Sequence, residues 1–193
     1  MRLAAAQDGV VINADAMQVY RDLSILTARP GAADEARVPH TLFGTVDAAE
    51  PHSVALWLDD AAAALAEARA TGRRPIIVGG TGLYLAALTE GLSPIPPVPA
   101  EIRDAWRARQ AEEPAEALHG ELTRRDPQMA ARLRPSDPQR VVRALEVIDA
   151  TGRSLADWQR ERTAPLVAPG EAVRIVLAPP RDALREAIAV RFE

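Results

Sequence analysis

The hydrophobic positions of the chain form short apolar runs that alternate with longer helical patterns. Residues 10–12 and 75–78 are continuous apolar runs next to glycines or charged residues, as is typical of buried strands in a parallel sheet. Between them, apolar residues recur at helical spacing from Ser53, a suitable N-cap, to Gly72. A further helix is expected over residues 83–90. This order of strands and helices predicts an α/β fold with a parallel sheet.

A second kind of pattern begins after the proline-rich stretch 94–99. From residue 100 to 162 the spacing is helical throughout, and residues 173–177 then predict another sheet strand, followed by a helix over 181–192. We therefore expect an α/β core over residues 1–96, an inserted helical subdomain over 97–166 and a return to the core over 167–193. The expected helices of the subdomain span residues 100–110, 115–124, 127–133, 138–151 and 155–162. The fourth has Ser136 as its expected N-cap, Pro138 in its first turn and Gly152 past its end.

The amino-acid composition excludes several classes of protein and of catalytic chemistry. The chain has no cysteine, no apolar run of membrane-spanning length and no secretory pattern at its start, so we expect a cytoplasmic protein without disulfides or a membrane partner. We also expect a monomer. It also has no lysine, so all 23 basic residues are arginines. Chemistry that depends on a lysine of these residues is thereby excluded.

Two candidate groups follow the two predicted strands. Asp15 comes at or just past the carboxyl end of the first strand, where a carboxylate can accept a proton; a turn or cap residue is the alternative interpretation. The stretch Gly79–Gly82 follows the second strand and opens a helix, which suits an anion such as phosphate; a tight turn that needs glycine for packing is the alternative. If the strands are parallel neighbours, Asp15 and Thr81 face each other across one crevice.

A third candidate is a cluster of basic residues between positions 124 and 143. The net charge of the whole chain is −4, but this stretch carries six arginines against Asp126 and Asp137. Gln139 and Arg143 are placed at i and i+4 on one helical face, which suits phosphates and base edges. The alternative is a solvated basic face with pairs such as Arg143–Glu146. The histidines have no metal-ligand spacing and are expected at the surface or in caps, and the tryptophans are expected to pack; these residues are His40, His52, His119, Trp57, Trp106 and Trp158.

Three motifs together resemble the tRNA dimethylallyltransferase (isopentenyl-tRNA transferase, IPP transferase) family. They are Asn13-Ala14-Asp15-Ala16-Met17-Gln18-Val19-Tyr20 with Thr27-Ala28-Arg29-Pro30, then Val78-Gly79-Gly80-Thr81-Gly82-Leu83-Tyr84, and Pro135 to Val147 with Asp137-Pro138-Gln139-Arg140-Val141-Val142-Arg143. The resemblance covers nearly the whole chain. It implies a P-loop NTPase-like parallel core with a helical insertion. It also implies transfer of a dimethylallyl group from dimethylallyl diphosphate to N6 of the adenosine 3′ of the tRNA anticodon, with Mg²⁺ as cofactor.

The resemblance also implies roles for individual residues. Asp15 is the expected general base, Thr81 lies beside the reacting centre, and Arg191 lies near the diphosphate, where positive charge stabilises a leaving group. No residue is assigned as a metal ligand. The expected partners are the tRNA anticodon stem-loop and dimethylallyl diphosphate. The residues implied to contact tRNA are Asp15, Ala16, Met17, Gln18, Thr81, Arg103, Gln139, Arg140, Val141, Val142 and Arg143.

The chain departs from the family pattern in several places. The phosphate loop GxxxxGK[ST] and the C-terminal portion of the family are absent, so the resemblance implies a fragment. Ala16 stands where serine is common, and Arg29 where lysine is common. Two other functions remain open at this point: a non-catalytic RNA-binding remnant and a small-molecule kinase with a P-loop core. The Asp137-Pro138-Gln139-Arg140 helix start argues against the kinase.

Overall fold

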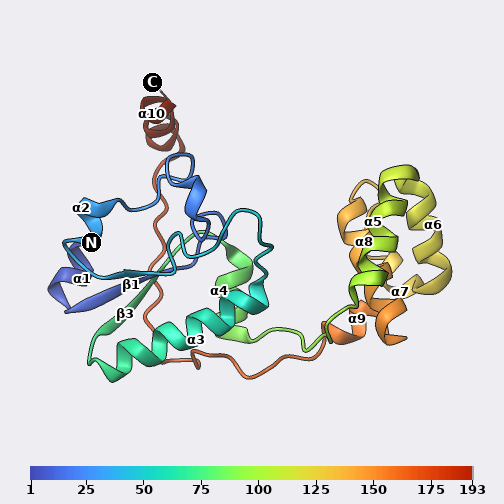
Figure 1. Cartoon of the computed structure of the whole chain (residues 1–193), viewed down its shortest axis with the longest axis horizontal. Helices are drawn as coiled ribbons and strands as arrows, with labels where there is room; N and C mark the ends of the chain where they lie inside the picture. The colour runs from blue at the N-terminus through green and yellow to red at the C-terminus, as the bar shows by residue number, and fades with distance from the viewer. Residues whose placement is uncertain (193) are drawn as a thin grey trace.

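The computed structural model describes residues 1–192 and shows an α/β part and a separate helical lobe. In Figure 1 the two are joined only by extended segments, with the helical lobe at the right. The α/β part contains α1 (Arg2–Ala6), β1 (Gly9–Asn13), the 3₁₀ helix η1 (Arg21–Leu23), α2 (Ala32–Glu35), β2 (His40–Thr41), α3 (Val54–Ala70), β3 (Arg74–Val78) and α4 (Gly82–Glu90). The predicted α/β class is confirmed.

The sheet has three parallel strands in the order β2-β1-β3. Val11 pairs with Ile76 and Asn13 with Val78, so β1 and β3 end at the same edge of the sheet. Every residue of the central strand β1 is buried. The predicted strands 10–12 and 75–78 are thus confirmed as parallel neighbours, while the short helix α2 was not predicted.

Trp57 of α3 joins the helices to the sheet. Its ring is fully buried and stacks on Tyr84 of α4, with ring centroids 4.4 Å apart and an interplanar angle of 13°. Its indole Nε1 donates to the backbone oxygen of Asn13 at 2.9 Å. The helix begins as the sequence predicts, because the Ser53 hydroxyl accepts from the Leu56 N–H. One aromatic side chain therefore fixes α3 and α4 against the end of β1.

The helical lobe contains α5 (Ala100–Glu112), α6 (Ala115–Arg125), α7 (Pro127–Ala130), α8 (Pro138–Thr151) and α9 (Leu155–Trp158). Val141 and Leu145 of α8 are fully buried at its centre, and Trp106 packs beside them with its Nε1 bonded to Asp149. The predicted bounds of α8 are confirmed. Its N-cap is Asp137, whose carboxylate accepts from the Arg140 N–H, so the expectation of Ser136 is wrong.

The chain enters and leaves this lobe at one place. The Thr163 N–H donates to the Leu92 carbonyl at 2.9 Å, and the Leu92 N–H donates to the Thr163 hydroxyl at 3.0 Å. Gly91, with a φ of +82°, ends α4 here, and a Cβ on it would overlap with the Thr163 carbonyl. This close approach joins the two segments that connect the lobe to the α/β part.

The predicted sheet strand over residues 173–177 is wrong. The segment is extended, but it belongs to none of the described strands, and Val173 and Leu177 are 89% and 88% exposed. Its β-branched residues meet the local preference of a strand, whereas pairing also requires a neighbouring backbone. In Figure 1 the segment runs past the sheet to α10 (Arg181–Phe192), the helix that the sequence predicts. No helix among residues 1–192 is long and apolar enough to cross a membrane.

Candidate active site

The carboxyl ends of β1 and β3 bring the segments of Asp15 and Thr81 together. The Ala16 N–H donates to the Thr81 hydroxyl at 2.9 Å, and the Thr81 N–H donates to the Ala14 carbonyl at 3.3 Å. Thr81 is the N-cap residue of α4, yet its side chain makes no capping bond to that helix. Its hydroxyl instead links the segments that follow β1 and β3.

The glycines of the turn serve different purposes. A Cβ on Gly79 would overlap with the backbone of Ala14, so glycine is needed there for close packing. Gly80 and Gly82, in contrast, have open space at their Cβ positions. The packing interpretation therefore holds for Gly79, while the other two leave room beside the first N–H groups of α4, which have no partners within a helix.

Asp15 is held in a defined conformation by its own turn. Its Oδ1 accepts from the Met17 N–H at 2.8 Å and from the Gln18 N–H at 3.3 Å. This is the turn role that the sequence offered as the alternative. Its Oδ2 has no hydrogen-bond partner within residues 1–192, and the residue is half-buried. One oxygen thus fixes the turn, and the other remains available to accept a proton.

The side chain of Asn13 holds the backbone of Asp15 through hydrogen bonds. No separate role was predicted for Asn13 from the sequence. It is fully buried, and its Oδ1 accepts from the Asp15 N–H at 2.9 Å. Its Nδ2 donates to the carbonyls of Asp15 at 3.0 Å and Leu42 at 3.1 Å. A polar residue that directly follows a buried strand was the available signal, but the sequence could not give the partners.

The segment after Asp15 rests on two neighbouring loops. The Gln18 side chain donates to the Thr27 carbonyl at 2.9 Å, and the Gly44 N–H donates to the Gln18 carbonyl at 2.9 Å. The Arg29 guanidinium donates to the Tyr20 carbonyl at 3.2 Å and occupies the space where a Gly44 side chain would lie. Ala16 is half-buried, whereas Met17 is half-exposed. The loops therefore leave Met17 exposed and hold Gln18 in place.

Tyr84 lies within electrostatic reach of Asp15. Burial, followed by interactions with Tyr20 and with the carboxylates of Asp15 and Asp60, raises the pKa of Tyr84 above its ordinary value. The Tyr84 hydroxyl therefore stays protonated in this environment, beside the carboxylates that raise its pKa.

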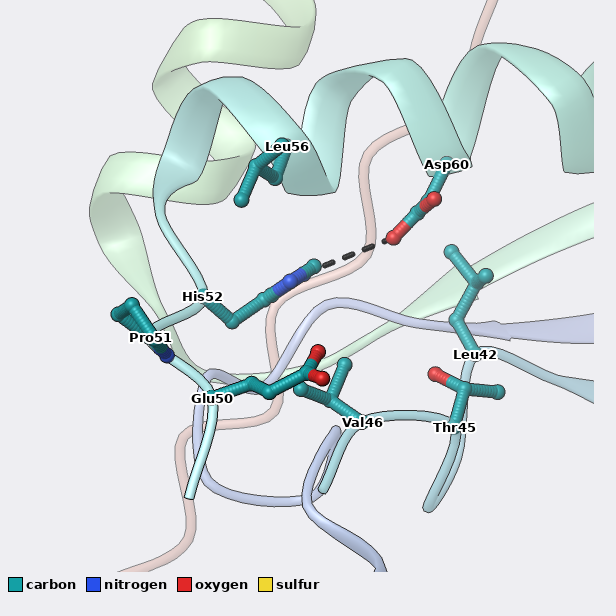
Figure 2. A pocket seen from close by; sticks show the side chains of 8 residues that line it. All are labelled: Leu42, Thr45, Val46, Glu50, Pro51, His52, Leu56 and Asp60. Atoms are coloured by element: carbon teal, nitrogen blue, oxygen red, sulfur yellow. Dashed lines mark ion pairs between the residues drawn. The ribbon is translucent and has the colours of Figure 1, made fainter. Parts of the chain in front are cut away.

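A recess of about 390 Å³ lies beside the site, between the loop 42–51 and α3 (Figure 2). His52 points into it, with Nε2 3.6 Å from Asp60 Oδ2 and its side chain only 7% exposed. That nitrogen has no hydrogen-bond partner. The expectation that His52 lies at the surface or in a cap is therefore wrong. The lining residues are Leu42, Thr45, Val46, Glu50, Pro51, His52, Leu56 and Asp60.

The residues of the expected RNA-contacting motif of α8 differ in their exposure. Gln139 and Arg140 are exposed, but Val141 and Val142 are buried in the core of the lobe, so their side chains cannot contact RNA. Arg143 bonds Glu146 at 3.1 Å, the pair that the sequence offered as the alternative. Arg103 is also exposed, on α5. The exposed residues of this group that keep a side chain available are Arg103, Gln139 and, in part, Arg140, which pairs with Asp137, and Arg143.

Arg191 lies on α10. Its Nη2 donates to the Leu26 carbonyl at 2.6 Å, and it has no hydrogen bond to Asp15 or Thr81 within residues 1–192. The expected position of Arg191 near the diphosphate stays a prediction, since the hydrogen bond that the structure gives it is the one to Leu26. Arg191 instead contacts the loop whose next carbonyl, Thr27, holds Gln18.

A family model and several relatives match this chain. The model described as IPP transferase matches residues 18–193, so the chain belongs to the IPP transferase family. The tRNA dimethylallyltransferase of Rhodopseudomonas palustris strain CGA009 is 57% identical over 192 residues, which are 100% of this chain and 60% of that protein. The protein of the same name from Methylocella silvestris is 58% identical over 193 residues, 100% of this chain and 64% of that protein. The chain thus spans about 60% of the length of these curated relatives.

Solved structures agree with the fold. A eukaryotic dimethylallyltransferase, described as acting on tRNA, has a TM-score of 0.70 and 27% identity, over 86% of this chain and 42% of that chain. A tRNA delta(2)-isopentenylpyrophosphate transferase from Staphylococcus epidermidis has a TM-score of 0.52 and 23% identity, over 98% of this chain and 62% of that chain. The predicted family and the predicted fold class, α/β with a P-loop NTPase-like parallel core, are confirmed.

Proposed function

We propose that this chain carries the proton-accepting and RNA-recognising parts of a tRNA dimethylallyltransferase. The observation that carries the proposal is the available Oδ2 of Asp15, held at the carboxyl edge of the sheet beside Thr81. Supporting it are relatives above 55% identity that bear this name. The whole activity belongs to the proposal because the chain spans only part of those relatives.

The proposed chemistry needs a base at that edge. The N6 lone pair of the adenosine forms a bond to C1 of the dimethylallyl group, the C1–O bond breaks, and diphosphate leaves with the electron pair. The amine loses a proton, which passes to Asp15 Oδ2. An exocyclic amine conjugated to its ring is a weak nucleophile, so accepting this proton as the bond forms lowers the barrier. The adenine must leave the base stack to reach the crevice.

The leaving diphosphate fits the start of α4. The open space at Gly80 and Gly82 lies where helix N–H groups favour an anion. Thr81 lies between these glycines and positions Ala16 at the same edge. Arg191 is proposed to act near the diphosphate only in a different placement of α10, because its present contact is Leu26.

RNA recognition is proposed for the segment 15–18 and for the exposed residues of the helical lobe. We propose the division into a core over 1–96, an RNA-contacting insertion over 97–166 and a further core segment over 167–193. Arg103, Gln139 and Arg140 offer exposed donors for the anticodon stem-loop. A monomer in the cytoplasm is the state we propose for this reaction.

Mg²⁺ is proposed as the cofactor, but the described residues do not form a site for it by themselves. No three His, Cys, Asp or Glu side chains of residues 1–192 cluster as metal ligands. Mg²⁺ prefers one or two carboxylates together with phosphate oxygens, and Asp15 already uses one oxygen in its turn. The proton transfer proposed above rests on the side chains of the chain alone.

The proposal is tested by grafting residues 1–193 into the matching segment of the Rhodopseudomonas palustris relative. The graft is incubated with dimethylallyl diphosphate and an anticodon stem-loop, and the RNA is analysed by mass spectrometry. We expect one dimethylallyl group on the stem-loop, and none on a matched RNA in which purine riboside, which lacks the exocyclic amine, replaces the target adenosine. RNA binding without transfer would favour the non-catalytic remnant, and phosphoryl transfer from ATP to a small molecule would favour the kinase.

A further inference from the structure

The recess that contains His52 has no part in the reaction proposed above. It lies between the loop 42–51 and the start of α3, with a volume of about 390 Å³. Recesses of about 300 to 1,000 Å³ hold small ligands in proteins. We propose that this recess binds an organic cation, a primary ammonium group on a short alkyl chain, through His52, Asp60 and Glu50. The proposal does not depend on dimethylallyl transfer or on RNA.

His52 gives the recess a polar atom without a partner. The side chain is only 7% exposed, and Nε2 is buried with no hydrogen bond to any of residues 1–192. In Figure 2 the ring points across the recess toward Asp60, whose Oδ2 lies 3.6 Å from Nε2. This separation is longer than a hydrogen bond. A bound group that donates to both atoms would remove the cost of leaving the buried nitrogen unpaired.

The carboxylates of the recess are not balanced by basic residues. In the loop 42–51, Asp47 pairs with Arg21 at 3.8 Å, whereas Glu50 forms no ion pair within the described residues. The ion-pair partner of Asp60 is the His52 ring. No arginine of residues 1–192 lines the recess, and the chain contains no lysine. A recess with this charge favours a cation from outside these residues.

The other walls of the recess fit an alkyl chain. The apolar lining residues are Leu42, Val46, Pro51 and Leu56. An alkylammonium packs its methylene groups on apolar surface while its charged end stays with polar partners, as a lysine side chain does. Its three N–H donors suit carboxylates and a ring nitrogen, which accept. A metal ion fits less well, because no three His, Cys, Asp or Glu side chains of residues 1–192 cluster as ligands.

The loop that forms one wall of the recess is fixed by hydrogen bonds. Leu42 has a φ of +65°, a conformation that leucine keeps only where its surroundings hold it. Asn13 Nδ2 donates to the Leu42 carbonyl at 3.1 Å, and the Val46 N–H donates to the Val19 carbonyl at 3.0 Å. A wall held in this way loses little conformational freedom on binding, so a small cation can bind without first ordering the loop.

The test titrates the chain with pentylammonium chloride at constant ionic strength and follows the histidine ring resonances by NMR. The chain has three histidines, so the H52Q variant identifies the signal of His52. We expect this signal to shift and to saturate below about 10 mM ligand, while those of His40 and His119 stay unchanged. D60N should weaken binding at least about 10-fold, because a hydrogen bond to a charged group is lost. D59N removes the same charge from an exposed neighbour outside the recess and should bind like the unaltered chain.

A second variant and a second ligand extend the test. E50Q changes an exposed side chain that packing does not require, and it should weaken binding by about 2- to 5-fold. The peptide acetyl-Gly-Lys-Gly-amide presents the same ammonium group on a polypeptide. Tighter binding of pentylammonium would identify a free alkylamine as the ligand, and tighter binding of the peptide would identify a lysine side chain.

Three results would overturn the proposal. The first is the absence of a saturable shift of the His52 signal with either ammonium ligand. The second is an equal effect of D59N and D60N, which would assign any binding to general surface charge. The third is an equal shift with 1-pentanol, which lacks the charge, or saturation by Zn²⁺ in place of the amine, since the recess would then be an apolar pocket or a metal site.

Discussion

The side-chain amide of Asn13 is hydrogen-bonded to both backbone groups of Asp15. Its Oδ1 accepts from the Asp15 N–H at 2.9 Å, and its Nδ2 donates to the Asp15 carbonyl at 3.0 Å. Asn13 is fully buried, so these bonds compete little with water. The Asp15 carboxylate, which is proposed as the base, is therefore attached to a backbone that cannot rotate freely. This restriction is the physical reason for the fixed direction of the carboxylate.

Replacing Asn13 by alanine should cost about 2–4 kcal/mol of unfolding free energy. The variant leaves the Asp15 N–H and the Leu42 carbonyl without these partners at a partly buried place. Urea unfolding of N13A measures the loss, and Met17→Ala, at a half-exposed position of the same segment, is the control. An N13A protein as stable as M17A would show that the amide does not hold the site.

The glycine turn should tolerate a methyl group at one position and not at another. In G79A the new Cβ meets the Ala14 backbone, so we expect a loss of more than about 2 kcal/mol, whereas G80A should change stability by less than about 1 kcal/mol. Thermal unfolding of the two variants makes the comparison. Equal stability would mean that β1 and the turn are not in close contact.

The stability of the helical lobe should depend on Glu121 in a pH-dependent way. The hydrogen bond from Arg124, with the charges of Arg124 and Arg125, lowers the pKa of the Glu121 carboxyl in the folded protein. Because the folded pKa lies below the unfolded one, the stabilisation is present above the unfolded value and is lost as pH falls through the folded value.

The corresponding experiment compares unfolding of the unaltered chain and E121Q between about pH 7 and pH 3. We expect E121Q to be less stable at neutral pH and the difference to shrink as pH falls. Glu112→Gln, which removes an exposed carboxylate from the same lobe, should show no such trend. A constant difference across the range would rule out the Glu121 carboxylate as its source.

Sequence patterns predicted most elements because those elements are set by local chemistry. The apolar run of β1, the Ser53 cap of α3 and the bounds of α8 all follow from neighbouring residues. The strand over 173–177 failed because its formation depends on a distant backbone that local preference does not report. The α8 cap failed because Ser136 and Asp137 are both good caps, and only geometry decides between them.

The candidate site was predictable in its residue types and not in its contacts. Asp15 and Thr81 could be placed at one sheet edge from the strand order, and the structure brings their segments together. The burial of His52 and the hydrogen bond between His119 and the Leu133 carbonyl depend on packing between elements far apart in the chain. The same holds for Arg191, whose contact with Leu26 no local pattern indicates.

The most direct measurement is single-turnover dimethylallyl transfer by the graft described above, compared with the same graft carrying Asp15→Asn. The amide keeps the shape and an acceptor for the turn, but it cannot take the proton. The account predicts a loss of at least about 100-fold in the single-turnover transfer rate at saturating RNA, while the variant still binds the anticodon stem-loop. Equal transfer rates in the two proteins would contradict the assignment of Asp15 as the base.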